Sequence, residues 1–313
     1  MPNIFPNLTH RRPTMQDAPA VHALITAREI ADHGEPDETL DDVLAEWKDL
    51  NLAEDAWLVY ASGDELVGYA AVFEEKEGCI LLWYTHPYHQ DLDLEPRLVA
   101  LCEGRALEKL AGKSNQQGSR LWMFVSDANP QDRAAVESAG YQPYKYYFRM
   151  QANSQDEPSQ PSWPPDTSIR TMKTGLDDRA VYDFIYTAFD WAGRGAPPSF
   201  EWWQGYMMRA DHFVPELWFL LEYQDEIVAA ALCYAYPENG WVRQLAVLPD
   251  WRRKGIGSAM LQHVFGVFYH RGQPKVSLVV DSTNPKAQNF YKNAGMYLER
   301  QHVEYSKVVK SPE

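Results

Sequence analysis

The sequence predicts a fold of the α+β class, built as two tandem domains that each hold a mixed, mostly antiparallel sheet flanked by helices. Three observations support this. The 313 residues, 45% of them hydrophobic, match the length and composition of about two globular domains. A proline-rich polar segment, residues 151–167, divides the chain near its middle. The two halves also repeat one order of strand-like and helix-like runs.

The clearest sign of duplication is a helix with the same punctuation in each half. Asn129-Pro130 precedes a helical run that ends at Ala139-Gly140, and Asn284-Pro285 precedes one that ends at Ala294-Gly295 with the same spacing. Proline in the first turn and glycine after the last turn are typical of helix boundaries. A repeat of this length indicates a duplicated domain rather than a short solenoid unit.

Earlier segments of the two halves also correspond. Helical runs are expected near Ala18–Ile30 and Leu176–Phe189, followed by hairpins over residues 57–73 and 217–234. Each half then continues as strand, helix, strand, helix and strand. The predicted boundaries are 1–150 for the first domain, 151–167 for the linker and 168–313 for the second domain.

Charge and composition exclude several classes of function. A net charge of -15 argues against a general nucleic-acid binder and against binding to an anionic membrane surface. No apolar run approaches the roughly 20 residues that a spanning helix needs, and the first residues do not resemble a secretory signal. Cys79, Cys102 and Cys233 fit a reducing compartment and form no zinc pattern. We therefore expect a cytoplasmic protein without a metal.

The most informative motif is the basic glycine loop Arg252–Ser258. It follows the apolar run 241–248 and precedes the apolar run 259–268, which predicts strand, loop and helix. Glycines there and the first N–H groups of a helix form a site for phosphate. The motif matches neither the Walker loop nor the dinucleotide fingerprint. A basic surface turn that only caps the helix is the alternative.

Residues 240–297 resemble the GNAT superfamily of acyl-CoA-dependent N-acetyltransferases. The resemblance rests on Leu245-Ala-Val247-x-Pro249, on Arg252-x-x-Gly255-x-Gly257, and on Asn284, Ala287, Tyr291 and Ala294-Gly295 in the family's order and spacing. The layout of the whole chain is similar to the tandem, mycothiol synthase-like branch of that family. The resemblance implies two GNAT-like domains and acetyl-CoA, or another acyl-CoA, as cosubstrate.

The resemblance also implies roles for individual residues. The backbone of Leu245 and Val247 would pair with the pantetheine arm, and Asn284 would hydrogen-bond near it. The Arg252 side chain would contact the pyrophosphate. The backbone N–H groups that would hold the pyrophosphate belong to Arg253, Lys254, Gly255, Ile256, Gly257 and Ser258.

The chemistry of acyl transfer to an amine points to a general acid for the departing thiolate. Tyr291 has a hydroxyl of ordinary pKa about 10 and suits that role, although an aromatic residue on the core face of a helix is the structural alternative. The N–H of Val247 is a candidate for stabilising the oxyanion. The family's usual strand glutamate is missing, with Trp241 in its place. Glu222 is a candidate base acting through water, Asp190 is another, and an amine of low pKa needs only water.

The acceptor is expected to contact the loop 190–198, including Asp190, and the aromatic stretch 200–206, including Trp202 and Trp203, which are equally well explained as core residues. A small-molecule primary amine is the favoured acceptor. A non-catalytic acyl-CoA-binding regulator and a protein or peptide N-acetyltransferase remain as alternatives. The oligomeric state is not predicted.

The first half lacks the key residues of the second. Aligning Pro87 with Pro249 places Asp93 and Glu95 at the two glycines of the loop, and aligning Asn129 with Asn284 places Val136 at Tyr291. Acidic groups there repel a pyrophosphate. The first domain is therefore expected to be degenerate and non-catalytic, with an independent small-molecule sensor site as the alternative.

Overall fold

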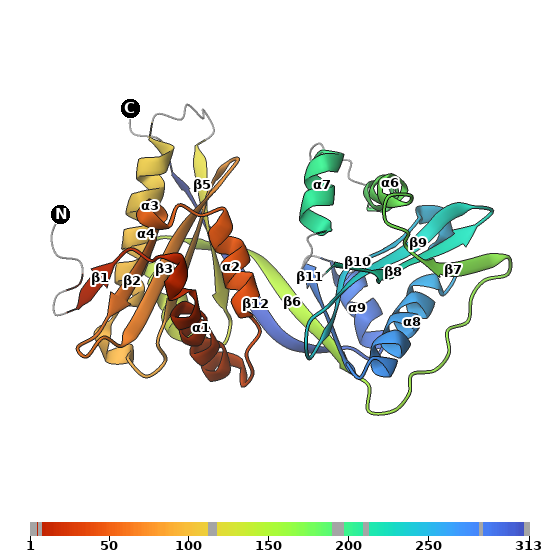
Figure 1. Ribbon diagram of the computed structural model, residues 1–313, viewed down its shortest axis with the longest axis horizontal. Helices are drawn as coiled ribbons and strands as arrows, with labels where there is room; N and C mark the ends of the chain where they lie inside the picture. The colour runs from red at the N-terminus through yellow and green to blue at the C-terminus, as the bar shows by residue number, and fades with distance from the viewer. Residues whose placement is uncertain are drawn as a thin grey trace. The chain divides into compact units, whose positions relative to one another are not determined.

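The computed structural model describes residues 5, 8–111, 118–189, 197–208, 213–281 and 284–309. These residues form two compact units. The first unit combines Met1–Tyr147 with Arg300–Glu313, and the second is Phe148–Glu299. Figure 1 shows the helices and strands of each unit.

The sheet of the first unit has the strand order β1-β2-β3-β4-β5-β12. Neighbouring strands are antiparallel except β4 and β5, which are parallel. The strands are β1 (Thr9–Arg11), β2 (Ala56–Tyr60), β3 (Leu66–Glu75), β4 (Gly78–Thr85), β5 (Ser119–Ser126) and β12 (Tyr297–Val309). The α-helices are α1 (Ala18–His33), α2 (Leu40–Lys48), α3 (Leu52–Asp55), α4 (Glu95–Leu110) and α5 (Pro130–Ser138).

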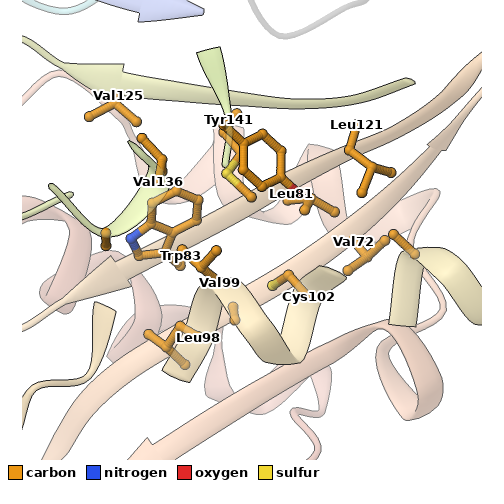
Figure 2. Packing of buried hydrophobic residues seen from close by; sticks show 14 of the residues in the cluster. Val72, Leu81, Trp83, Leu98, Val99, Cys102, Leu121, Val125, Val136 and Tyr141 are labelled. Atoms are coloured by element: carbon orange, nitrogen blue, oxygen red, sulfur yellow. The ribbon is translucent and has the colours of Figure 1, made fainter. Parts of the chain in front are cut away.

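Side chains of this sheet alternate between two cores, one on each face. In β2, Ala56 and Leu58 pack with α1 and α2, whereas Trp57 and Val59 pack with α4 and α5. This alternation follows from the two-residue period of a strand. Figure 2 shows part of the second core, where side chains of α4, such as Leu98, lie among those of the sheet, such as Leu81.

The sheet of the second unit has the order β6-β11-β10-β9-β8-β7. The pairs β7–β8, β8–β9 and β9–β10 are antiparallel, whereas β10 and β11 are parallel. Its strands are β6 (Gln142–Asn153), β7 (Thr167–Thr171), β8 (Phe213–Tyr223), β9 (Glu226–Ala235), β10 (Gly240–Val247) and β11 (Lys275–Asp281). Its α-helices are α6 (Asp178–Ala188), α7 (Phe200–Met207), α8 (Ile256–His270) and α9 (Pro285–Asn293).

This sheet also has a core on each face. Trp218 and Leu220 of β8 pack with α6 and α7, whereas Leu217, Phe219 and Leu221 pack with α8. The prediction of a mixed, mostly antiparallel sheet flanked by helices is thus confirmed for both units.

The compact units differ from the predicted domain boundaries at β12 and at β6, whose residues 148–150 were expected in the first domain. The sequence placed residues 300–313 in the second domain, but β12 pairs with β5 from His302 to Val309, and its Val303 and Tyr305 lie in the core of the first unit. In turn, Met150 and Ala152 of β6 lie in the core of the second unit. The final strand of each half therefore completes the sheet of the other half. The connection between β6 and β7 covers residues 154–166.

The helix-start signals that the two halves share are present in the structure. Asn129 caps α5 by accepting hydrogen bonds from the backbone N–H groups of Gln131 and Asp132 at 3.2 and 3.1 Å. Asn284 caps α9 by accepting one from the backbone N–H of Ala287 at 3.1 Å. Both helices have proline in the first turn.

Among the described residues, no helix is both long enough and apolar enough to cross a membrane. Cys79, Cys102 and Cys233 are buried and form no disulfide bond among the described residues. Burial raises the pKa of Cys102 to about 12, which keeps this thiol protonated and unreactive near neutral pH.

Because β12 completes the sheet of the first unit, a substitution in the core-facing part of β12 is expected to destabilise that unit. Tyr305→Ala removes a large buried side chain from the core of the first unit and is expected to cost about 3 kcal/mol of unfolding free energy. Hydrogen exchange should show lost protection in β3 and β4 and unchanged protection in β8 and β9. The matched control Phe219→Ala should give the reverse. Lost protection in β8 of the Tyr305→Ala variant would contradict the assignment of β12 to the first unit.

Candidate active site

The centre of the candidate site is the point where β10 separates from β11. The two strands pair only at Gly240 with Val276 and at Trp241 with Ser277. Strand β10 continues along β9 to Val247, with an irregularity between Val242 and Gln244. Within the described strands, the remainder of β10 therefore has one edge without a strand partner.

The backbone groups on this open edge belong to Leu245 and Val247. The N–H of Leu248 donates to the carbonyl of Val228 on the β9 side at 3.0 Å. Because successive residues of a strand direct their N–H groups to opposite sides, Leu245 and Val247 direct theirs away from β9. The two residues that the sequence analysis assigned to the pantetheine arm thus face the open edge.

A basic loop leads from the end of β10 into α8. It contains a 3₁₀ turn at Pro249–Trp251, and both Arg253 and Gly255 have left-handed backbones with φ of 62° and 78°. Helix α8 begins at Ile256, so its first N–H groups have no acceptors within the helix. With Arg253, Lys254 and Ser258 exposed beside them, these groups form a site for an anion.

The Arg252 side chain holds this loop in place. Its Nε donates to the carbonyl of Val247 at 3.0 Å, and its Nη2 donates to the carbonyl of Ala188, the last residue of α6, at 2.5 Å. The guanidinium therefore ties the end of β10 to the end of α6. Two donors of the guanidinium are thus already used by carbonyl groups of the chain. The contact of the Arg252 side chain with a pyrophosphate stays a prediction.

Gly257 allows α8 and α9 to approach closely. A Cβ at Gly257 would lie 3.1 Å from the ring of Phe290 on α9, which is closer than ordinary contact. The neighbouring Tyr291 is partly buried and makes no hydrogen bond through its hydroxyl within the described residues. Burial raises the pKa of Tyr291 to about 12, so the hydroxyl carries its proton throughout the neutral range.

Exposed aromatic residues of α7 lie against β10. Trp202, 56% exposed, stacks on Tyr206 with ring centroids 4.9 Å apart, and Arg243 of β10 donates to the Tyr206 hydroxyl at 3.0 Å. Trp203 is instead 1% exposed and packs on Trp218 in the core. Of the two tryptophans suggested for the acceptor, the structure leaves only Trp202 accessible.

Gln244 is a polar group that the sequence analysis left without a role. Its side-chain oxygen is buried and has no hydrogen-bond partner among the described residues. A buried amide oxygen without a donor is costly. The sequence signal was a polar residue within the apolar strand, next to the irregularity of β10.

The two carboxylates considered as bases are not brought to this edge by any described contact. Glu222 forms an ion pair with Arg170, which donates to its Oε1 from Nε at 2.8 Å and also pairs with Asp177. This network joins β7, β8 and the turn before α6. Asp190 lies outside the described residues.

The corresponding region of the first unit carries acidic groups. Asp93 has a left-handed backbone with φ of 47°, and its counterpart Gly255 is also left-handed. Glu95 is buried at the first position of α4, where it accepts a hydrogen bond from Thr85 at 2.8 Å. On α5, burial raises the pKa of Asp132 to about 7. Val136, the counterpart of Tyr291, lies among the apolar side chains of the core (Figure 2).

Comparisons with known proteins agree with this geometry. The model of the acetyltransferase (GNAT) family matches residues 180–296. A solved GCN5-related N-acetyltransferase from Sphaerobacter thermophilus is 31% identical, with a TM-score of 0.84 over 99% of this chain and 97% of that one. The mycothiol acetyltransferase of Saccharopolyspora erythraea is 27% identical over 75% of this chain and 80% of its own length.

A tandem GNAT protein from the clavulanic acid pathway has the same fold. Its TM-score is 0.75 at 11% identity, over 98% of this chain and all of that one. The tandem arrangement expected from the sequence is therefore also found in a solved structure.

The close approach at Gly257 gives a prediction about the loop. Gly257→Ala pushes Phe290 by about a few tenths of an ångström and shifts α9 against α8, which is expected to weaken coenzyme A binding by roughly tenfold. Titration calorimetry measures this. Gly266→Ala is the control, because a Cβ there meets nothing within 4 Å in the same helix. Equal affinities of the two variants and the parent chain contradict the prediction.

Proposed function

Because the chain belongs to the GCN5-related N-acetyltransferase (GNAT) family, and is therefore an N-acetyltransferase, we propose that its second unit transfers an acetyl group from acetyl-CoA to a primary amine of a small molecule. The observation that carries the proposal is the open edge of β10 beside the basic start of α8. The thioester arm of acetyl-CoA can pair with the open strand edge, and its pyrophosphate can bind at the basic start of α8.

The proposed cosubstrate fits the residues present. The pantetheine amides hydrogen-bond with the open-edge backbone of Leu245 and Val247, as an added strand would. The pyrophosphate accepts hydrogen bonds from the N–H groups of the loop from Arg253 to Ser258. At φ of 78°, a residue with a Cβ would have a strained backbone, which explains why position 255 is a glycine. Asn284 lies at the start of α9 and faces solvent, where it is available to the pantetheine region.

The proposed reaction is direct transfer. The neutral amine attacks the thioester carbonyl, a C–N bond forms, and the C–S bond breaks with the electron pair leaving on sulfur. The N–H of Val247 stabilises the oxyanion of the intermediate. Tyr291 donates its proton to the thiolate, and the proton lost by the amine goes to water. The tyrosinate then takes a proton from water, which returns the site to its starting state.

Water, rather than Glu222, accepts the amine proton in this proposal. The Glu222 carboxylate is held in an ion pair with Arg170 of β7, and no described contact brings it to the open edge of β10. The fraction of acceptor that is unprotonated at a given pH then limits the rate. An amine with a pKa below the ordinary value of about 10.4 is the best acceptor under these conditions.

The acceptor is proposed to lie between α7 and β10. Trp202 and Tyr206 offer exposed aromatic faces, and Arg243 adds a positive charge. This combination suits a small polar molecule that carries both an amine and an anionic or hydroxylated part. The similarity to enzymes named mycothiol acetyltransferase supports a small-molecule acceptor.

The first unit is proposed to be non-catalytic. Buried Glu95 places a carboxylate at the start of α4, where a pyrophosphate would need positive charge. Strands β4 and β5 pair over four residues, from Gly78 to Leu81, compared with two for β10 and β11, and the pairing of β4 with β3 has no irregularity. The first unit thus differs from the second in the length of this pairing and in the charge at the start of the helix that follows.

The proposed function is tested by following coenzyme A thiol release from acetyl-CoA in the presence of amino sugars, amino acids, polyamines and short peptides. Release with at least one small amine, together with mass spectrometry of an N-acetylated product, is the expected result. Release only with peptides would assign the protein to peptide acetylation. Binding of acetyl-CoA without release across the panel would reject the proposed transfer.

Tyr291→Phe tests the general acid. Loss of the hydroxyl is expected to lower kcat about 100-fold while leaving the KM for acetyl-CoA unchanged. Since the pKa of Tyr291 is about 12, its acid form persists at lower pH, and the parent enzyme should gain activity from pH 7 to 10 as the amine loses its proton. Steady-state kinetics over this range measures both effects.

Tyr269→Phe is the matched control for this substitution. Tyr269 lies on α8, about 20 Å along the helix from the basic loop. The kcat and KM of the Tyr269→Phe variant should therefore equal those of the parent enzyme. An unchanged kcat for Tyr291→Phe would remove the hydroxyl from the acid role.

A further inference from the structure

The first unit contains a cluster of metal-ligating side chains that the proposed function does not use. Glu65, His86 and His89 each offer one ligand atom, and these atoms all lie within 4.8 Å of one another. Glu65 stands at the start of the second strand of the β2–β3 hairpin, and the two histidines follow β4 in the loop before α4. This loop corresponds to the basic glycine loop of the second unit.

We propose that Glu65, His86 and His89 bind a divalent transition-metal ion, with zinc as the best match. Two imidazoles and one carboxylate are a common set of protein ligands for zinc, and they leave a fourth position open to water or another ligand. The proposal concerns the first unit alone and does not depend on acetyl transfer in the second.

The distances within the cluster suit this ion. The Nε2 of His89 lies 3.1 Å from Oε2 of Glu65. Two ligand atoms bound to one tetrahedral zinc at about 2.0–2.1 Å are about 3.3 Å apart. The His86 and His89 rings have centroids 5.3 Å apart and meet edge to face. Rotation of the partly exposed side chains is enough to bring the third ligand atom into range.

The backbone holds the three residues together without a metal. The N–H of His86 donates to the carbonyl of Val67 at 2.9 Å, which fixes the loop after β4 beside the strand that begins next to Glu65. The N–H of His89 donates to the carbonyl of His86 at 3.1 Å. The carbonyl of Glu65 accepts a hydrogen bond from Ala61 at 2.9 Å, which closes the hairpin. A site whose backbone is already ordered loses little entropy on binding.

An ion pair between His89 and Glu65 does not account for the whole cluster. The ring of His86 lies beside that of His89, with centroids 5.3 Å apart, and belongs to the same set of three candidate ligands. Two imidazoles and a carboxylate gathered in this way offer lone pairs that a divalent cation attracts.

The structure also provides a comparison pair that lacks the third ligand. His270 and Glu157 have the same separation between Nε2 and a carboxylate oxygen, 3.1 Å, and both side chains are exposed. They form no cluster of three candidate ligands among the described residues. If a histidine–glutamate pair were sufficient to bind the metal, His270 would contribute as much as His89.

The test uses the full chain, freed of metal by a chelator and titrated with Zn²⁺ by calorimetry and with Co²⁺ by visible absorption. One equivalent should bind, and Co²⁺ should give the absorption of a low-coordinate nitrogen and oxygen site. His86→Ala, His89→Ala and Glu65→Gln should each weaken binding at least about tenfold, the scale found even for outer partners of metal ligands. His270→Ala should leave it unchanged.

Two results would overturn the proposal. One is the absence of saturable binding by the parent chain. The other is affinity that is unchanged in His86→Ala and His89→Ala, or lost in His270→Ala. Circular dichroism of each variant checks that it is folded, and Glu65→Gln keeps the side-chain volume, so a loss of binding in that variant is not a loss of fold.

Discussion

The early separation of β10 from β11 is the constraint on which the candidate active site depends. Parallel pairing ends after Gly240 and Trp241, and the N–H groups of Leu245 and Val247 then face an edge without a strand partner within the described strands. Unpaired strand edges are normally liabilities that a protein covers. Here the edge is next to the basic start of α8, and the same Arg252 side chain that fixes the loop also holds the end of the strand. An extended cosubstrate with an anionic end satisfies both features at once.

The two halves show how one architecture can keep its folding signals while changing its chemistry. Asn129 and Asn284 cap equivalent helices, and Asp93 and Gly255 occupy equivalent left-handed positions. What differs is charge and pairing. The first unit has buried Glu95 and an apolar Val136 where the second has glycine and Tyr291. Caps and turns serve the fold and are kept in both units, whereas the residues that we propose to bind and process acetyl-CoA differ between the units.

The first unit has not thereby lost all capacity for binding. The loop that lacks glycines carries His86 and His89, and the hairpin beside it carries Glu65. No metal was expected from the sequence, because its three cysteines form no zinc pattern. Glu65 and His86 stand at opposite ends of the β3–β4 hairpin, and the pairing of Gly68 with Thr85 and the hydrogen bond between His86 and Val67 bring them together.

The sequence by itself determined the elements, the duplication, the family and the glycine loop that only the second half carries, because these depend on local periodicity and on short motifs. It also placed Leu245, Val247 and Tyr291 in the region of the site. Tertiary structure decided the rest: that Trp203 is core while Trp202 is exposed, that Glu222 is paired with Arg170, and that β12 completes the first unit. Alternation along a strand fixes which side chains are buried, but not which sheet the strand joins, because backbone hydrogen bonds are the same for every partner.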